Sequence, residues 1–264
     1  MKTPTFLKST ALVIALIGSM TCCANQSKET AKTEATTAET EATTDKFESA
    51  DWQLYNLRGK VKSCTESKVW AELVGTDQLK AMDEEPMVQE MEFDESGWLL
   101  SNNYYRRSTT SREAAEYGYN PNDAEEVVKV KRNDKGYITE FESKHKEYGE
   151  NYDGHFRIAN SFDDRGNLTT SDFTGWEWTA TTNYKYDPQD VYTEIEELTG
   201  DYEENTKETA TVKVIETDAH GNWTKAYLFC KKTLKTYSPE EDKMATSKVD
   251  DTYYILTRKI TYWE

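Results

Sequence analysis

A four-residue turn signature recurs five times along this chain of 264 residues and constrains its fold more than any other feature. An Asp or Asn at the first position of a type I turn caps its own backbone, and Gly at the fourth position takes the left-handed conformation that closes a β-hairpin. The signature therefore predicts five hairpins of similar build. Its copies are Asp94-x-x-Gly97, Asn133-x-x-Gly136, Asp163-x-x-Gly166, Asp187-x-x-Asp190 and Asp218-x-x-Gly221.

A large apolar residue stands two positions after each turn, namely Leu99, Ile138, Leu168, Tyr192 and Trp223. Between the turns, apolar and polar residues alternate with the two-residue period of strands. Consecutive hairpins pair most simply with their sequence neighbours. We therefore predict an all-β fold, an antiparallel meander of repeated hairpins that forms a long twisted or partly closed sheet. The only helices that the sequence allows are short ones, over residues 108–116 and near Trp52.

The first 23 residues have the pattern of an export signal, with Lys2 and Lys8 before an apolar run over residues 11–18. This run is too short to span a bilayer. It leads to Cys22 and Cys23, and a Cys in this place resembles the lipobox of bacterial lipoproteins, in which the thiol is acylated. We predict lipid attachment at Cys22, because the small Thr21 suits a cleavage site. Attachment at Cys23 and an ordinary secretory signal are the alternatives.

The chain divides into three parts. Residues 1–23 are the predicted lipoprotein signal peptide, residues 24–50 a polar, disordered tether, and residues 51–264 one all-β domain. This organisation predicts an exported protein, anchored to the cell envelope (outer membrane or cell surface) through its N-terminal lipid alone.

The net charge limits which partners the protein can bind, and the cysteines limit which disulfides it can form. The chain has 32 basic and 49 acidic residues, a formal net charge of −17. Such a surface repels phosphate backbones, so nucleic acid is an unfavourable partner. In an exported protein, Cys64 and Cys230 can form a disulfide, but two separately buried thiols would give the same sequence.

The residues that carry chemistry form no recognisable catalytic or metal site. His145, His155 and His220 are far apart in the sequence, and His220 is expected to be an exposed turn residue with few partners. We therefore predict no enzyme activity, no cofactor and no metal. Paired carboxylates of a glycan-active hydrolase are a less favoured alternative, with candidates among Glu194, Glu196 and Glu197 or at Asp163 and Asp164.

A row of aromatic residues is the best candidate for a binding face. Trp176, Trp178, Tyr184 and Tyr186 occupy alternate positions, so they line one face of a strand. Such a row either packs into the core or forms a platform on which sugar rings stack. The core interpretation is favoured, because a half-buried sheet needs an apolar stripe.

Three of the turns carry a family resemblance. Phe93-Asp94-x-x-Gly97-x-Leu99, Phe162-Asp163-x-x-Gly166-Asn167-Leu168-Thr169 and Thr217-Asp218-x-x-Gly221-Asn222-Trp223-Thr224 resemble the Tyr-Asp (YD, or RHS) repeat in its short lipoprotein form, common in Bacteroidetes. The resemblance covers most of residues 55–230 and implies an all-β envelope lipoprotein. It implies no activity, and the encapsulation by large RHS proteins does not carry over to five irregular repeats.

From these features we expect a lipid-anchored, exported, non-catalytic binding or structural module of the bacterial envelope. Its partner would be an envelope protein or an envelope polymer. The alternative is a glycan-binding protein that uses the aromatic face.

Overall fold

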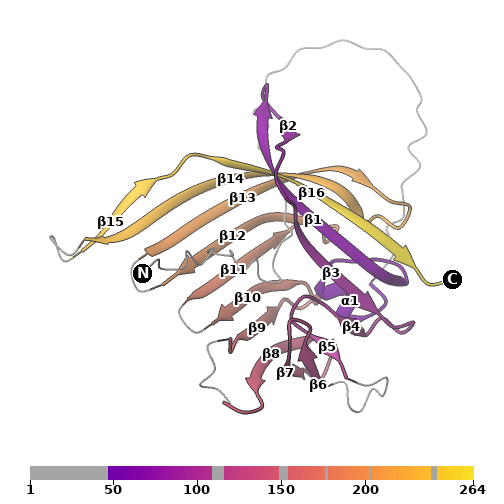
Figure 1. The fold of residues 1–264 in the computed structure, drawn as a ribbon. Coiled ribbons are helices and arrows are strands. Elements are labelled where there is room, and N and C mark those ends of the chain that lie inside the picture. The colour runs from indigo at the N-terminus through magenta and orange to yellow at the C-terminus, as the bar shows by residue number, and fades with distance from the viewer. Residues whose placement is uncertain (1–46, 109–115, 149–153, 176–177, 202–203, 239–242) are drawn as a thin grey trace, which may run out of the picture.

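The computed structural model describes residues 47–108, 116–148, 154–175, 178–201, 204–238 and 243–264. Within these ranges the protein is all-β, as predicted, with one short helix near Trp52 (Figure 1). The elements are α1 (Ala50–Leu54), β1 (Val61–Val74), β2 (Gln78–Ala81), β3 (Met87–Phe93), β4 (Leu99–Ser101), β5 (Arg106–Arg107), β6 (Tyr117–Asn120), β7 (Asp123–Arg132), β8 (Ile138–His145), β9 (Arg157–Phe162), β10 (Leu168–Thr174), β11 (Thr179–Tyr186), β12 (Tyr192–Gly200), β13 (Glu204–Thr217), β14 (Trp223–Ser238), β15 (Lys243–Lys248) and β16 (Thr252–Tyr262).

The strands form one antiparallel sheet that closes on itself. From β3 to β14 each strand pairs with its sequence neighbours, which confirms the predicted meander. The C-terminal strand β16 then lies between β1 and β14, while β1 pairs with β3. Because β13 also pairs with β14, the described strands close into a 14-stranded barrel, with β2 and β15 outside the ring.

All five predicted turns are confirmed. The fourth residue of each has a positive φ, from 60° at Asp190 to 89° at Gly166. In every copy, the Oδ1 atom of the first residue accepts hydrogen bonds from the backbone N–H groups two and four residues later, as Asp163 does from Arg165 and Asn167. The turns connect β3 to β4, β7 to β8, β9 to β10, β11 to β12 and β13 to β14. In an antiparallel meander these connections all lie at the same end of the barrel, the turn end.

The core fills the barrel interior. The apolar residue two positions after each turn is buried, with exposed fractions of 1–5%. These side chains pack with inward-facing residues of the neighbouring strands in one continuous hydrophobic cluster. The two-residue alternation thus separates an apolar interior from a charged outer face, as the sequence predicts.

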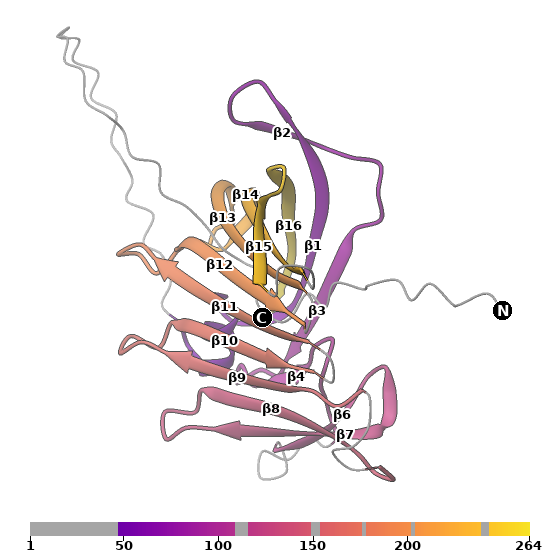
Figure 2. The ribbon, with the colours of Figure 1, turned by 90° about the vertical axis from the view of Figure 1, so that its left-hand side faces the viewer.

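Two hairpins extend beyond the ring. β2 pairs with the last residues of β1, and β15 with the last residues of β14 (Figures 1 and 2). A second, smaller apolar cluster lies where the first hairpin meets the outer face of β14 and β16, and consists of Ala71, Leu79, Tyr227 and Ile255. The barrel therefore carries two additional hairpins at the end opposite its turns.

Candidate functional site

The N-terminal segment of the described chain crosses the turn end of the barrel. We name residues 49–59, which include α1, the capping segment. Ser49 is the N-cap of α1, and its Oγ accepts a hydrogen bond from the backbone N–H of Trp52 at 3.1 Å. Ser49 and Ala50, which the sequence assigned to the tether, thus belong to the folded part. The rings of Trp52 and Tyr55 pack on Phe93 in the core.

The N-terminal part of the capping segment contacts the two turns nearest the start of the meander. Ser49 Oγ donates to the carbonyl oxygen of Gly97 at 2.8 Å. Asp51 is 2% exposed, and its carboxylate accepts from the Leu99 N–H at 2.7 Å and from both terminal nitrogens of Arg132 at 2.5 and 2.8 Å. Arg132 in turn donates to the carbonyl of Gly136 at 2.7 Å. A buried, bidentate ion pair therefore joins α1 to both turns.

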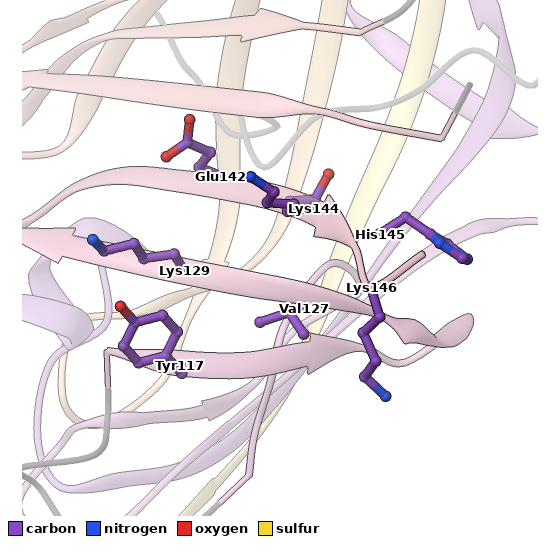
Figure 3. Close-up of a pocket in the computed structure, with 8 residues that line it drawn as sticks. Tyr117, Val127, Lys129, Glu142, Lys144, His145 and Lys146 are labelled. Carbon is purple, nitrogen blue, oxygen red and sulfur yellow. The ribbon is translucent and has the colours of Figure 1, made fainter. Parts of the chain in front are cut away.

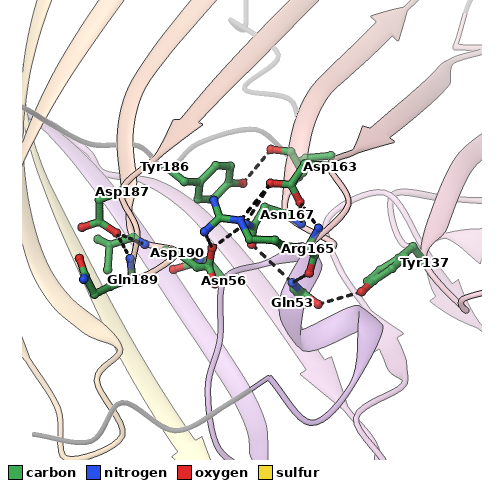
Figure 4. Close-up of polar contacts among 12 residues, drawn as sticks. Gln53, Asn56, Tyr137, Asp163, Arg165, Asn167, Tyr186, Asp187, Gln189 and Asp190 are labelled. Atoms are coloured by element: carbon green, nitrogen blue, oxygen red, sulfur yellow. Dashed lines mark hydrogen bonds and ion pairs between the residues drawn. The ribbon is translucent and has the colours of Figure 1, made fainter.

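The third and fourth turns meet the middle of the capping segment (Figure 4). Gln53 Nε2 donates to the Arg165 carbonyl at 2.9 Å, and Asn56 Nδ2 donates to the Asp190 carbonyl at 2.8 Å. The carboxylate of Asp190 also accepts from Asn167 at 2.8 Å and pairs with Arg165 at 2.6 Å. Asp in place of Gly at this turn therefore links it to the preceding turn.

The fifth turn contacts the C-terminal end of the capping segment. The Arg58 N–H donates to Asn222 Oδ1 at 2.7 Å, and Asn222 Nδ2 donates back to the Arg58 carbonyl at 2.9 Å. Gly59 has a φ of 74°, and a Cβ atom there would lie 2.8 Å from the ring of His220. The capping segment thus contacts every one of the repeated turns.

A buried ion pair ties the capping segment to the barrel wall. Arg258 Nε donates to Glu66 at 3.0 Å inside the barrel, and Arg258 also donates to the Tyr55 carbonyl at 2.9 Å. Its guanidinium lies 3.9 Å from the ring centroid of Trp223. Burial raises the pKa of Glu66 to about 7, although Arg258 opposes this shift. The interior at the turn end of the barrel is therefore occupied by side chains whose ion pair and hydrogen bonds stabilise the fold.

A groove lies on the outer face of β6, β7 and β8 (Figure 3). Its volume is about 450 Å³. Tyr117 and Lys129 lie at one end of it and His145 and Lys146 at the other, with Val127 between them (Figure 3). The groove is lined by Tyr117, Val127, Lys129, Glu142, Ser143, Lys144, His145 and Lys146. No signal in the sequence pointed to it, because its residues come from three strands.

The structure places the aromatic row in the core rather than on a surface. Tyr184 is 6% exposed, and Trp178 is half-buried with its ring stacked on Phe173 at 4.4 Å. Tyr186 is half-buried and donates from its hydroxyl to the Leu168 carbonyl at 2.7 Å. The favoured core interpretation is therefore confirmed at Trp178, Tyr184 and Tyr186, where the alternation reflects an inward-facing stripe, and the alternative of a binding face at these three positions is wrong. Trp176 lies outside the described residues.

Of the two alternatives for Cys64 and Cys230, the structure confirms separately buried thiols and not a disulfide. Cys64 and Cys230 are both free and buried. They lie on β1 and β14, with β16 between these strands, and pair with Ile260 and Thr252 of β16. Eight residues of β16 separate these partners, roughly 26 Å at 3.3 Å per residue. The thiols are two separate core residues.

The histidines and the candidate carboxylates form no shared site. The His220 ring packs on Tyr262 at 4.3 Å, so the expectation of a turn side chain with few partners is wrong. Glu194 pairs with Lys185 and Glu196 with Lys207. In the described part of the chain, no group of three or more His, Cys, Asp or Glu side chains is placed to hold a metal ion.

Several predictions fall outside the described residues, namely the signal peptide, lipid attachment at Cys22, most of the tether and most of the helix over 108–116. Over the described ranges, no helix has the length and apolar character of a membrane span. Comparison with family models and with curated proteins finds no match to this chain.

Proposed function

We propose that this protein is an exported, lipid-anchored, non-catalytic binding module of the bacterial envelope. The proposal rests on the observation that the chain enters the barrel at its turn end, through the capping segment. Phe47, the first described residue, lies under the guanidinium of Arg58 at 4.5 Å. The capping segment that follows bonds to the first, third and fourth turns, and to Tyr137 and Asn222 directly after the second and fifth turns. An anchor ahead of residue 47 would therefore hold the barrel by its turn end.

This attachment leaves the outer face available to a partner. The predicted polar tether of about 25 residues would span roughly 30 Å as a flexible chain, which would be enough to hold the barrel off a lipid surface. The hairpins β1–β2 and β14–β15 extend at the end opposite the turns and would point away from the anchor. A net charge of −17 keeps such a module soluble and away from anionic head groups.

Fractionation of cells that express the full chain tests the anchor. Wild-type protein is expected in the membrane fraction and the Cys22→Ser/Cys23→Ser double variant in the soluble fraction. The two single variants identify the acylated residue, which we expect to be Cys22. Membrane association of the double variant without detergent would contradict lipid anchoring.

A screen against envelope polysaccharides and envelope proteins tests the binding role. We expect saturable binding of the full chain to at least one of these components. Protease treatment of intact cells, run beside the screen, tells whether the barrel faces the exterior. A chain that binds none of the components would contradict a binding role.

A further inference from the structure

The groove of Figure 3 combines an exposed ring with cations on one face of the sheet. The cross-strand pairs Tyr117–Lys129 and Lys129–Glu142 place these three side chains in one row across β6, β7 and β8. Val127 and Lys144 form the next row on the same outer face. Residues in such rows are neighbours, so the groove presents an aromatic ring and ammonium groups to one ligand.

Lys129 is the central cation of this groove. Its ammonium group lies 5.7 Å from the ring centroid of Tyr117. Among the residues that the structure describes, Lys129 has no ion pair, whereas Glu142 pairs with Lys131 at 3.5 Å. A half-exposed lysine without a carboxylate partner is available to an anionic ligand. Lys144 and Lys146 also line the groove, but Lys146 pairs with Glu125 at 3.3 Å, so Lys129 is the cation on which recognition of an anionic ligand would depend.

Tyr117 supplies the second half of the recognition chemistry. It is 47% exposed, whereas the other aromatic rings of the described residues, apart from Tyr148 and Tyr237, are buried or half-buried. An exposed ring offers a flat apolar face, and a pyranose has a matching apolar face of C–H groups. The groove volume of about 450 Å³ is within the range of small-molecule sites and fits one or two sugar rings.

We infer that this groove binds a carboxylate-bearing sugar, a uronic acid residue of an envelope polysaccharide. The sugar ring stacks on Tyr117, and its carboxylate pairs with the ammonium group of Lys129. This inference rests on the proposed function and names the ligand class for it.

The test is a calorimetric titration of the full chain, purified in detergent, with trigalacturonate and with neutral maltotriose. We expect saturable binding of trigalacturonate that weakens as salt is raised, because salt screens exposed charges. Lys129→Gln and Tyr117→Ala should each lower the affinity about tenfold. Lys231→Gln and Tyr237→Ala are the matched controls, since they remove an exposed lysine and an exposed tyrosine on β14, outside the groove.

The variants change exposed or half-exposed side chains, and unchanged thermal unfolding confirms that each one folds. Equal affinity for maltotriose, or trigalacturonate binding that survives both Lys129→Gln and Tyr117→Ala, would overturn the inference. So would the absence of trigalacturonate binding. Binding of a neutral polymer or an envelope protein in the screen, unaffected by these variants, would overturn the inference and leave the proposed binding role standing.

Discussion

Replacing Asp51 with Ala is expected to destabilise the barrel by about 3 kcal/mol. The carboxylate of Asp51 is buried and accepts three hydrogen bonds, one from Leu99 and two from Arg132. Removing one partner of a buried ion pair typically costs about 3–5 kcal/mol, because the other charge is left without compensation. The Arg132 side chain is 17% exposed, so water solvates part of its charge and the cost lies at the low end of that range.

Urea unfolding followed by circular dichroism measures this cost. Asp134→Ala is the control, since it removes an exposed carboxylate from the neighbouring turn and is expected to change the unfolding free energy by less than about 0.5 kcal/mol. In an Arg132→Met background, the cost of Asp51→Ala should fall to about 1 kcal/mol, the share of the Leu99 hydrogen bond. A loss below 1 kcal/mol for Asp51→Ala alone would refute the reasoning.

Three further predictions concern single residues. Gly166→Val should cost about 3 kcal/mol in urea unfolding, because φ is 89° there and a Cβ atom would overlap the Tyr137 hydroxyl; an unchanged midpoint would contradict the turn geometry. The pKa of Glu66 is raised to about 7, so its carboxyl binds the proton more tightly in the folded state than in the unfolded state. The contribution of this protonated carboxyl to stability is therefore lost as pH rises from about 4.5 through 7. The melting temperature of Glu66→Gln should therefore rise relative to wild type between pH 5 and pH 8, and parallel profiles would contradict the shift. Trp178→Ala should cost about 2 kcal/mol, less than a fully buried Trp, because its ring is half-buried on Phe173; thermal stability equal to wild type would show that this contact contributes nothing.

The hairpins could be predicted because their determinants are local. Each turn is specified within four residues, and the following apolar residue marks the inward face. Asp190 shows the limit of this reasoning. Its place as the fourth residue of the signature predicts its left-handed conformation, but its bonds to Arg165 and Asn167 depend on the neighbouring turn. Barrel closure also lies beyond local signals, since it requires β16 to lie between β1 and β14.

The capping segment could not be predicted because its partners are distant in the chain. Asp51 bonds to a residue 48 positions away, Gln53 to one 112 away, and Arg58 to one 164 away. In the sequence these polar side chains look like the surface of a short helix. The groove is missed for a related reason, because Tyr117, Lys129 and Glu142 become neighbours only through strand pairing.

The aromatic row illustrates an ambiguity in the strand period. Alternation identifies which residues share a face, and Ala180, Thr182 and Tyr184 do lie together in the interior. It cannot tell an inward face from a binding platform, because both carry large rings. Burial decides the matter, and it depends on which side of the strand the barrel closes.

Native-state hydrogen exchange tests most directly whether the capping segment holds the five turns together. The amides of Gln53, Leu57 and Arg58 donate to the Ser49 carbonyl, the Trp52 carbonyl and Asn222 Oδ1. If the segment is part of the cooperative unit, these amides exchange only with global unfolding, at the rate of strand amides in β14. Exchange at the rate of an unstructured peptide, while the strands stay protected, would contradict its role in joining the tether to the barrel.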